Sequence, residues 1–336
     1  MDAPAELRRP ESTDDLIWRA ATADDIDALL DLDRASGAVD HPHFQNTRDE
    51  IAENFEASWV DPAADSIVAV EPGGQIVGYG MSVLSASRVT IARSYTEGSV
   101  RPSHRGRGIG TKIIDWLDAR SRQQLASLDE PLPGWILFHL DARQTDLPPL
   151  LEARGYRPAR YYLELGRNLS QPIRPRPLPD GVRLVTYGPE WSEAARLATN
   201  DAFRDHWGSQ PYTEESWRLH RETEVARDDL SFLAVGVNED GQDEVAGLVV
   251  ATVRPDDFAG HGFSHSYVDL VGTRRAWRRK GIAPALLTVH LEAARGAGLE
   301  GVVLDVDAEN PSGALGFYES LGFAESNRTI AYLKEF

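Results

Sequence analysis

The chain contains no cysteine among its 336 residues. Thiolate catalysis, disulfide cross-links and cysteine-based metal sites are therefore excluded. Long apolar runs are missing as well, because the most hydrophobic stretch, residues 245–253, is far shorter than the roughly 20 residues that span a bilayer. The first 13 residues are polar and charged, without the apolar core of a secretory leader. We therefore expect a cytoplasmic protein without a membrane partner.

Positive charge is scarce: 35 Lys and Arg stand against 53 Asp and Glu, a formal net charge of −18. This balance argues against a nucleic acid partner, because phosphate binding needs a basic face, and it is compatible with an amine substrate. Two short segments reverse the local charge. Their basic residues are Arg101, Arg105, Arg107 and Lys112, and Arg274, Arg275, Arg278, Arg279 and Lys280. An anionic ligand would explain the reversal, and a solvated basic edge is the alternative.

These basic segments contain one turn motif written twice. Arg105-Gly106-Arg107-Gly108-Ile109-Gly110 reads R-x-x-G-x-G, and Arg278-Arg279-Lys280-Gly281-Ile282-Ala283 reads R-x-x-G-x-A. Each copy follows an apolar segment and opens an amphipathic helix pattern. Small residues let a backbone approach a pyrophosphate, and the amides at a helix start supply hydrogen-bond donors and a positive dipole end. The motif therefore predicts two phosphate-binding turns in a duplicated chain.

The order of predicted elements also repeats. In each half a helix, a strand pair, the phosphate-binding turn, a helix, a buried strand and a short helix follow one another. The region between the halves, residues 169–181, contains four prolines, which favour a semi-rigid linker. The sequence therefore predicts an α/β fold of two domains, residues 1–168 and 182–336.

The second half continues with Asn310-Pro311-Ser312-Gly313-Ala314-Leu315-Gly316-Phe317-Tyr318-Glu319-Ser320-Leu321-Gly322-Phe323. Together with the turn motif, this segment resembles the N-x-x-A-x-x-x-Y-x-x-x-G-F pattern of the GNAT superfamily of acetyl-CoA-dependent N-acetyltransferases. The resemblance covers nearly the whole chain, once per half. It implies a twisted mixed sheet in each half, with splayed central strands and flanking helices.

The resemblance also implies which residues bind acetyl-CoA. The strand before the turn would pair with the pantetheine arm through Val271, Gly272 and Thr273, and the turn of residues 278–283 would hold the diphosphate. Asn310 would cap the following helix beside the coenzyme. Val100 and the turn of residues 105–110 are the counterparts in the first half. No metal is required.

For catalysis, the resemblance assigns Tyr318 as the acid that protonates the departing thiolate. A phenol with a pKa near 10 lies roughly 1–2 units above a thiol, so this proton transfer is accessible. Asp269 and Tyr267 occupy the positions of the family's base. Two-residue alternation predicts that both lie on one face with Val271 and Thr273. Asp269 takes the amine proton, anchors a cationic substrate or forms a structural salt bridge.

The first half departs from this pattern. Leu151 stands where the second half has Tyr318, and counting back from the turn places Thr96 and Ser94 at the positions of Asp269 and Tyr267. We therefore expect a non-catalytic N-terminal domain. It would bind coenzyme A without turnover or serve as a scaffold for the substrate site.

A tandem pair with one degenerate half is similar to the mycothiol synthase group of this superfamily. We expect acetyl transfer to a primary amine of a small molecule by direct attack, in a monomer or homodimer. A cysteinyl pseudodisaccharide as the acceptor, a protein or peptide acceptor, and a coenzyme A-binding sensor without turnover are the alternatives.

Overall fold

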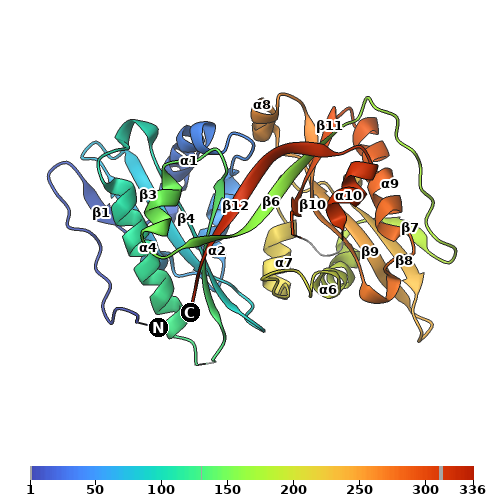
Figure 1. Ribbon diagram of the computed structural model, residues 1–336, viewed down its shortest axis with the longest axis horizontal. Helices are drawn as coiled ribbons and strands as arrows, with labels where there is room; N and C mark the ends of the chain where they lie inside the picture. Colours follow the sequence, from blue (N-terminus) through green and yellow to red (C-terminus); the bar gives the residue numbers. More distant parts are fainter. Residues whose placement is uncertain (1, 130, 310–312) are drawn as a thin grey trace. The chain divides into compact units, whose positions relative to one another are not determined.

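The computed structural model describes residues 2–129, 131–309 and 313–336. The chain divides into an N-terminal unit, Met1–Tyr161 with Thr329–Phe336, and a C-terminal unit, Tyr162–Arg328. Each unit is a mixed α/β sheet covered by helices on both faces, as the sequence predicts (Figure 1). No helix among the described residues is long and apolar enough to cross a membrane.

The sheet of the N-terminal unit has the strand order β1-β2-β3-β4-β5-β12. Its strands are β1 (Ile17–Arg19), β2 (Ser66–Val70), β3 (Ile76–Leu84), β4 (Ala92–Val100), β5 (Gly134–Asp141) and the end of β12 (Ala324–Glu335). Strands β4 and β5 run parallel, whereas the other neighbours that pair within this unit are antiparallel. The parallel pair lies next to the closing strand β12.

Helices cover both faces of this sheet. They are α1 (Ile26–Asp40), α2 (Arg48–Glu56), α3 (Pro62–Asp65), α4 (Ile109–Ala126) and α5 (Leu147–Glu152). Strand β2 shows the two faces by alternation: Ile67 and Ala69 pack in the core beneath α4, whereas Val68 and Val70 pack beneath α1 and α2. A continuous apolar strand is the pattern expected of a strand buried on both faces.

The C-terminal unit repeats this architecture with the strand order β6-β11-β10-β9-β8-β7. Its strands are the end of β6 (Arg157–Asn168), β7 (Arg183–Thr186), β8 (Phe232–Val237), β9 (Asp243–Thr252), β10 (His265–Thr273) and β11 (Gly301–Asp307). Strands β10 and β11 form the parallel pair. The two units thus share one connectivity, which is the result expected of a duplication.

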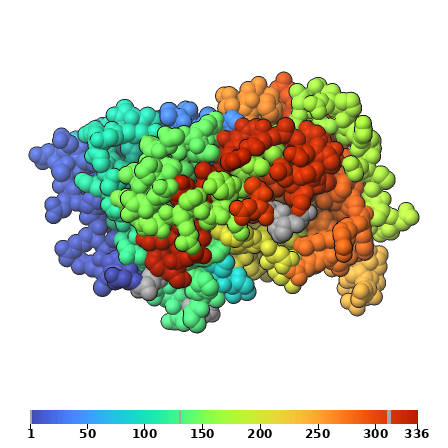
Figure 2. Space-filling view, viewed as in Figure 1, coloured from blue at the N-terminus to red at the C-terminus, as the bar shows by residue number. Residues whose placement is uncertain are grey.

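The helices of the C-terminal unit also lie on two faces. They are α6 (Ser192–Ala202), α7 (Glu214–Arg221), α8 (Phe258–His261), α9 (Ile282–Gly296) and α10 (Ala314–Ser320). Helices α9 and α10 share one core, and α6 and α7 share the core on the opposite face. Figure 2 shows the surface of α10 (red) beside that of α9 (orange). We call these the α9 face and the α6 face.

The last strand of each sheet comes from a long strand that serves both units. Residues 162–168 of β6 pair with β11 in the C-terminal unit, and residues 329–335 of β12 pair with β5 in the N-terminal unit. The predicted division into residues 1–168 and 182–336 differs from these units, because each repeat contributes its closing strand to the other sheet. Both strands follow an equivalent Gly-aromatic pair, so the sequence pattern is the same with or without this exchange.

The proline-rich segment of residues 169–181 contains no helix or strand, but it is part of the C-terminal unit. Leu169 and Ile173 are buried in the core of that unit. The Arg167 guanidinium donates hydrogen bonds to the carbonyl oxygens of Asn168 and Pro172. The segment is therefore packed against the C-terminal unit and is not a free linker.

Candidate active site

The parallel strands β10 and β11 of the C-terminal unit separate partway along their length. Strands β10 and β11 pair from His265 with Gly301 through Val268 with Leu304, and no later pair joins them among the described residues. Strand β10 nevertheless stays paired with β9 as far as Thr273. We call this divergence the C-terminal splay. Residues 270–273 of β10 have no strand partner on the β11 side among the described residues, so this edge can offer backbone hydrogen bonds to an extended ligand.

A β-bulge lies where the strands separate. The register between β9 and β10 shifts between Val268 and Leu270, so Asp269 is the extra residue of the bulge. The bulge interrupts the alternation of β10, and the prediction that Tyr267, Val271 and Thr273 share a face is wrong. Val271 packs in the core of the α9 face, whereas Tyr267 is paired across from Thr252 and lies on the α6 face.

Asp269 points to the same side of the sheet as Tyr267. Its Oδ1 atom accepts a hydrogen bond of 3.3 Å from the hydroxyl of Thr252, the buried partner of Tyr267 in the β9–β10 ladder. Asp269 is half-buried. The structure thus brings the two predicted base positions together on the α6 face.

Tyr267 forms a hydrogen bond across the splay to Asp305, a carboxylate that no sequence motif identified. Its hydroxyl donates a hydrogen bond of 2.9 Å to Oδ2 of Asp305 on β11. Burial, followed by the charges of Asp305 and Asp269, raises the pKa of Tyr267 well above its usual value. Asp305 interrupts the apolar run Val302–Val306, and an acid inside a buried strand is the signal that would have identified it.

The predicted phosphate-binding turn lies at the start of α9. Gly281 caps this helix with a φ of 84°, and a Cβ atom placed on it would meet no atom within 4 Å. Arg279 has a φ of 63°, a left-handed conformation that costs a non-glycine residue roughly 1–2 kcal/mol. The turn therefore presents the amino end of a 15-residue helix through an open, strained backbone.

The basic residues of the turn have different roles. Arg278 donates from Nη2 to the carbonyl oxygen of Ala202 and from Nε to that of Thr273, so it fastens the turn to the end of β10. The Lys280 Nζ atom lies 4.6 Å from the centre of the Trp277 ring. Arg279 is exposed and forms no hydrogen bond or ion pair with the residues the structure describes. Arg279 is therefore available to an anionic ligand.

Tyr318 lies on α10, on the α9 face. It is 7% exposed and belongs to the core that also contains Leu286 of α9. Its ring contacts Phe317 and Phe323. Burial raises the pKa of Tyr318 to about 12, so the phenol keeps its proton at neutral pH, as a proton donor must. Asn310, the predicted cap before α10, lies outside the described residues.

The N-terminal unit contains a splay at the equivalent place. Strands β4 and β5 pair through Thr96 with Phe138 and then separate, while β4 remains paired with β3 as far as Val100. No register shift interrupts β3 and β4. The first residue beyond the last parallel pair is therefore Glu97 here and Asp269 in the C-terminal unit.

This comparison corrects the counterparts predicted by counting from the turn. Ser94 and Thr96 point to the α4 core, where the Ser94 hydroxyl joins those of Ser82 and Ser121. The structural counterparts of Tyr267, Asp269 and Asp305 are Tyr95, Glu97 and His139. Counting fails because the bulge adds one residue to β10. The N-terminal splay thus carries a carboxylate, Glu97, where counting from the turn predicted the uncharged Thr96.

Glu97 is held by two neighbours on the α2 side of the sheet. Its Oε1 atom accepts hydrogen bonds from the Asn54 side chain at 2.9 Å and from the Tyr79 hydroxyl at 3.3 Å. Crowding by the surrounding protein, with contributions from Asp33 and Glu53, raises the pKa of Glu97 to about 7. Leu151, the predicted counterpart of Tyr318, is fully buried.

The turn of residues 105–110, the second predicted phosphate-binding turn, has the same backbone shape as its C-terminal counterpart. Gly106 and Gly108 have φ values of 73° and 79°, and Gly108 caps α4. Arg105 donates from Nε to the carbonyl oxygen of Val100, as Arg278 does to Thr273. Arg105 also forms a bidentate ion pair with Asp40 at 2.6 and 2.8 Å. The two turns therefore share their backbone conformation and their fastening arginine.

Comparisons with known proteins agree with this architecture. The sequence profile of the acetyltransferase (GNAT) family matches residues 26–130 and 193–323, one segment in each repeat. The mycothiol acetyltransferase of Nocardia farcinica is 27% identical over 91% of this chain and 93% of its own length. That of Acidothermus cellulolyticus is 32% identical over 67% of this chain and 66% of its own length.

A solved structure is similar over the same extent. The GCN5-related N-acetyltransferase from Sphaerobacter thermophilus superimposes with a TM-score of 0.70 at 26% identity, covering 97% of each chain. The splayed strands, the glycine turns and the profile matches lead to one conclusion: the chain is a tandem acyltransferase of the GNAT acetyltransferase family.

Proposed function

We propose that the chain transfers an acetyl group from acetyl-CoA to a primary amine of a small molecule, and that the reaction occurs at the C-terminal splay. One observation carries the proposal. The C-terminal unit combines the open helix-start turn, the free strand edge and a buried tyrosine on one face of the splay, with carboxylates on the other face.

The residues of the α9 face fit acetyl-CoA. The diphosphate would contact the amides of residues 279–283 and the free guanidinium of Arg279, where a helix start favours an anion. The pantetheine arm would pair with the free edge of Val271–Thr273. When bound, the coenzyme supplies the thioester that the amine attacks. An amide near Val271 would stabilise the oxyanion that forms.

Tyr318 is the proposed acid. The departing sulfur needs a proton, and Tyr318 remains protonated far above neutral pH. Its raised pKa also makes a lasting phenolate costly. We therefore expect the phenol to regain a proton from the attacking nitrogen in the same catalytic cycle.

The α6 face fits the acceptor. Asp269 and Asp305 place two carboxylates beside the splay, which suits a ligand that arrives as an ammonium ion. The two substrates would then meet through the splay from opposite faces. Such juxtaposition contributes up to roughly 7–11 kcal/mol when the geometry is good. Asp269 serves as an anchor or as a base in this arrangement.

The relatives favour a small acceptor over a protein. The curated relatives described above are named mycothiol acetyltransferases, so a cysteinyl pseudodisaccharide is the first acceptor to test. A panel of free amines, peptides and this pseudodisaccharide, read by release of free coenzyme A thiol, separates the alternatives. Acetylation of peptides without acetylation of any free amine would contradict the proposal.

Substitution of the acid tests the location of the reaction. Tyr318→Phe should lower kcat by about 10²-fold or more without changing coenzyme A affinity, measured by calorimetry. Tyr187→Phe is the matched control, because Tyr187 is also 7% exposed and lies in the core of the α6 face. Equal turnover by wild type and Tyr318→Phe would remove Tyr318 from the mechanism. Coenzyme binding without any turnover by wild type would indicate a sensor.

A further inference from the structure

Resting on the proposed function, we propose that Asp305 accepts the proton of the acceptor's ammonium group and that Tyr267 positions it. This assigns the base to β11, the neighbour of the strand that carries the predicted base positions. Asp269 is then the anchor of the acceptor.

Asp305 lies where the two parallel strands separate. Asp305 is the first residue of β11 beyond the last parallel pair, Val268 with Leu304. It lies on the α6 face, because its neighbours Leu304 and Val306 are buried in the core of the α9 face. A carboxylate in this position lies at the separation point of the two strands, where the amine must meet the thioester.

The Asp305 carboxylate is held by one of its two oxygens. Tyr267 fixes Oδ2 by a hydrogen bond of 2.9 Å across the splay. No described residue donates a hydrogen bond to Oδ1, and the side chain is exposed. One oxygen is therefore oriented while the other is open to a ligand. This is the arrangement that a general base requires.

The groups around Asp305 favour its protonated form. Crowding by the protein raises its pKa to about 6; the charge of Glu164 on β6 adds to the rise, whereas the Tyr267 hydrogen bond and the charge of His261 oppose it. A base with a pKa near the working pH combines a useful ionised fraction with proton affinity.

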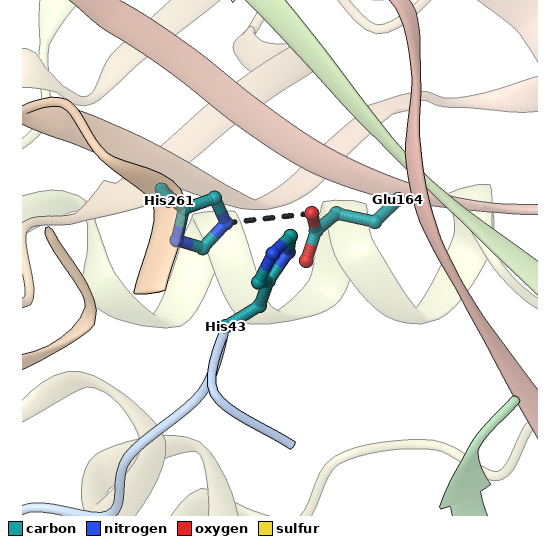
Figure 3. A group of neighbouring side chains, drawn as sticks. All are labelled: His43, Glu164 and His261. Atoms are coloured by element: carbon teal, nitrogen blue, oxygen red, sulfur yellow. Dashed lines mark ion pairs between the residues drawn. The ribbon is translucent and has the colours of Figure 1, made fainter. Parts of the chain in front are cut away.

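Glu164 is itself held in place. It is the cross-strand partner of Asp305 in the β6–β11 ladder, and its Oε1 atom lies 3.4 Å from Nε2 of His261 (Figure 3). The Ser326 hydroxyl donates to the same oxygen at 2.6 Å. A fixed negative charge beside Asp305 makes the carboxylate a stronger base than an isolated aspartate.

The protons balance in this scheme. Asp305 removes one proton from the ammonium ion and releases it to solvent through its open oxygen. The neutral amine forms the C–N bond, and the C–S bond breaks as the sulfur receives the proton of Tyr318. The nitrogen loses its second proton on becoming an amide, and this proton restores the phenol. One proton is released for each acetyl group transferred.

The test begins with Asp305→Asn in the full chain. At pH 7 we expect kcat/KM for the amine to fall by about 10²-fold, with loss of the acidic limb of the pH profile and unchanged coenzyme A affinity. Asp307→Asn is the control, because it removes a carboxylate two residues further along the same strand. A fall of similar size in the control, or an acidic limb that survives in Asp305→Asn, would overturn the proposal.

Two further substitutions should move the acidic limb in opposite directions. Tyr267→Phe removes a hydrogen bond that favours the carboxylate, so the limb should shift to higher pH. Glu164→Gln removes a negative charge that disfavours it, so the limb should shift to lower pH. A purely structural role would lower the rate without these opposed shifts, and an unmoved limb in both variants would refute the assignment.

A titration without substrate separates this proposal from the proposed function. Carbon NMR of the coenzyme-free protein, with Asp305→Asn for assignment, should show a carboxyl group that titrates near pH 6. Titration at an ordinary aspartate pKa near 4 would contradict the inference even in an active transferase. If the group titrates near 6 but wild type acetylates no amine, the proposed function fails instead.

Discussion

The two units carry the same frame with different chemistry at the splay. The α6 face of the C-terminal unit presents Tyr267, Asp269 and Asp305, and the equivalent positions of the N-terminal unit present Tyr95, Glu97 and His139. Desolvation lowers the pKa of His139 to about 4, so this histidine is neutral where the C-terminal unit has a carboxylate. On the opposite face, Leu151 replaces Tyr318.

This difference separates features that both units share from features found in the C-terminal unit. The fastening arginine, the left-handed turn and the splayed strands recur in both units, because they determine the backbone of the sheet. The proposed proton donor, Tyr318, and the second carboxylate, Asp305, occur in the C-terminal unit. We infer that the N-terminal unit has kept a binding frame without the groups that protonate a leaving thiolate.

The largest expected effect comes from making the C-terminal unit resemble the N-terminal one. Tyr318→Leu should lower turnover by about 10²-fold or more, because no other buried phenol of the described part of that face replaces the donor. Adding Glu97→Gln to this variant should leave the residual rate unchanged in a coupled thiol-release assay. A further drop would show that the N-terminal splay also catalyses transfer.

An intermediate effect concerns the turn. Arg279→Gly gives the C-terminal turn the glycine that the N-terminal turn has at Gly106. We expect coenzyme A affinity to fall roughly tenfold through loss of the guanidinium. The unfolding midpoint should rise by about 2–4 °C, because the left-handed strain is relieved.

Arg279→Ala is the matched control for this substitution. It removes the same guanidinium but keeps a side chain in the left-handed conformation. Calorimetry should therefore show the same loss of affinity, whereas thermal unfolding should show no gain in stability. An affinity equal to wild type in both variants would exclude Arg279 from the coenzyme site.

The smallest effect concerns Glu97. Its pKa is about 7 in the folded chain and near 4.3 in an unfolded one, so the folded state binds the proton more tightly. The stabilising contribution of protonated Glu97 is complete below about pH 4 and is lost as pH rises through 7. Glu97→Gln should thus match wild type in unfolding midpoint at acidic pH and exceed it increasingly between pH 5 and 8. A constant difference across that range would contradict the raised pKa.

The sequence predicted those parts of the site that depend on residues adjacent in the chain. Both glycine turns, the strand before each turn and the helix after it lie where the motifs place them, because their residue types determine the backbone directly. The bulge at Asp269 was not predictable, since no glycine or proline marks it and only the pairing with β9 shows the added residue. The exchange of closing strands could not be predicted either, because β6 and β12 follow the same Gly-aromatic pattern and the sequence does not show which sheet each strand joins.

Asp305 could have been noticed in the sequence, although it belongs to none of the motifs. An acid inside an apolar strand indicates a special environment, yet its partner Tyr267 lies 38 residues earlier and is brought near only by the parallel pairing of β10 and β11. The same holds for Glu164, which reaches Asp305 through the antiparallel ladder. Side chains from different strands meet only when the strands pair in a particular register. The sequence pattern predicts that register less precisely than it predicts the turns.

The most direct test of the central claim is a crystal structure of the full chain with coenzyme A. We predict that the diphosphate lies against the amides of residues 279–283, and that the thiol points into the splay between β10 and β11 on the side of Tyr318. A structure with coenzyme A bound elsewhere and the C-terminal turn empty would contradict it.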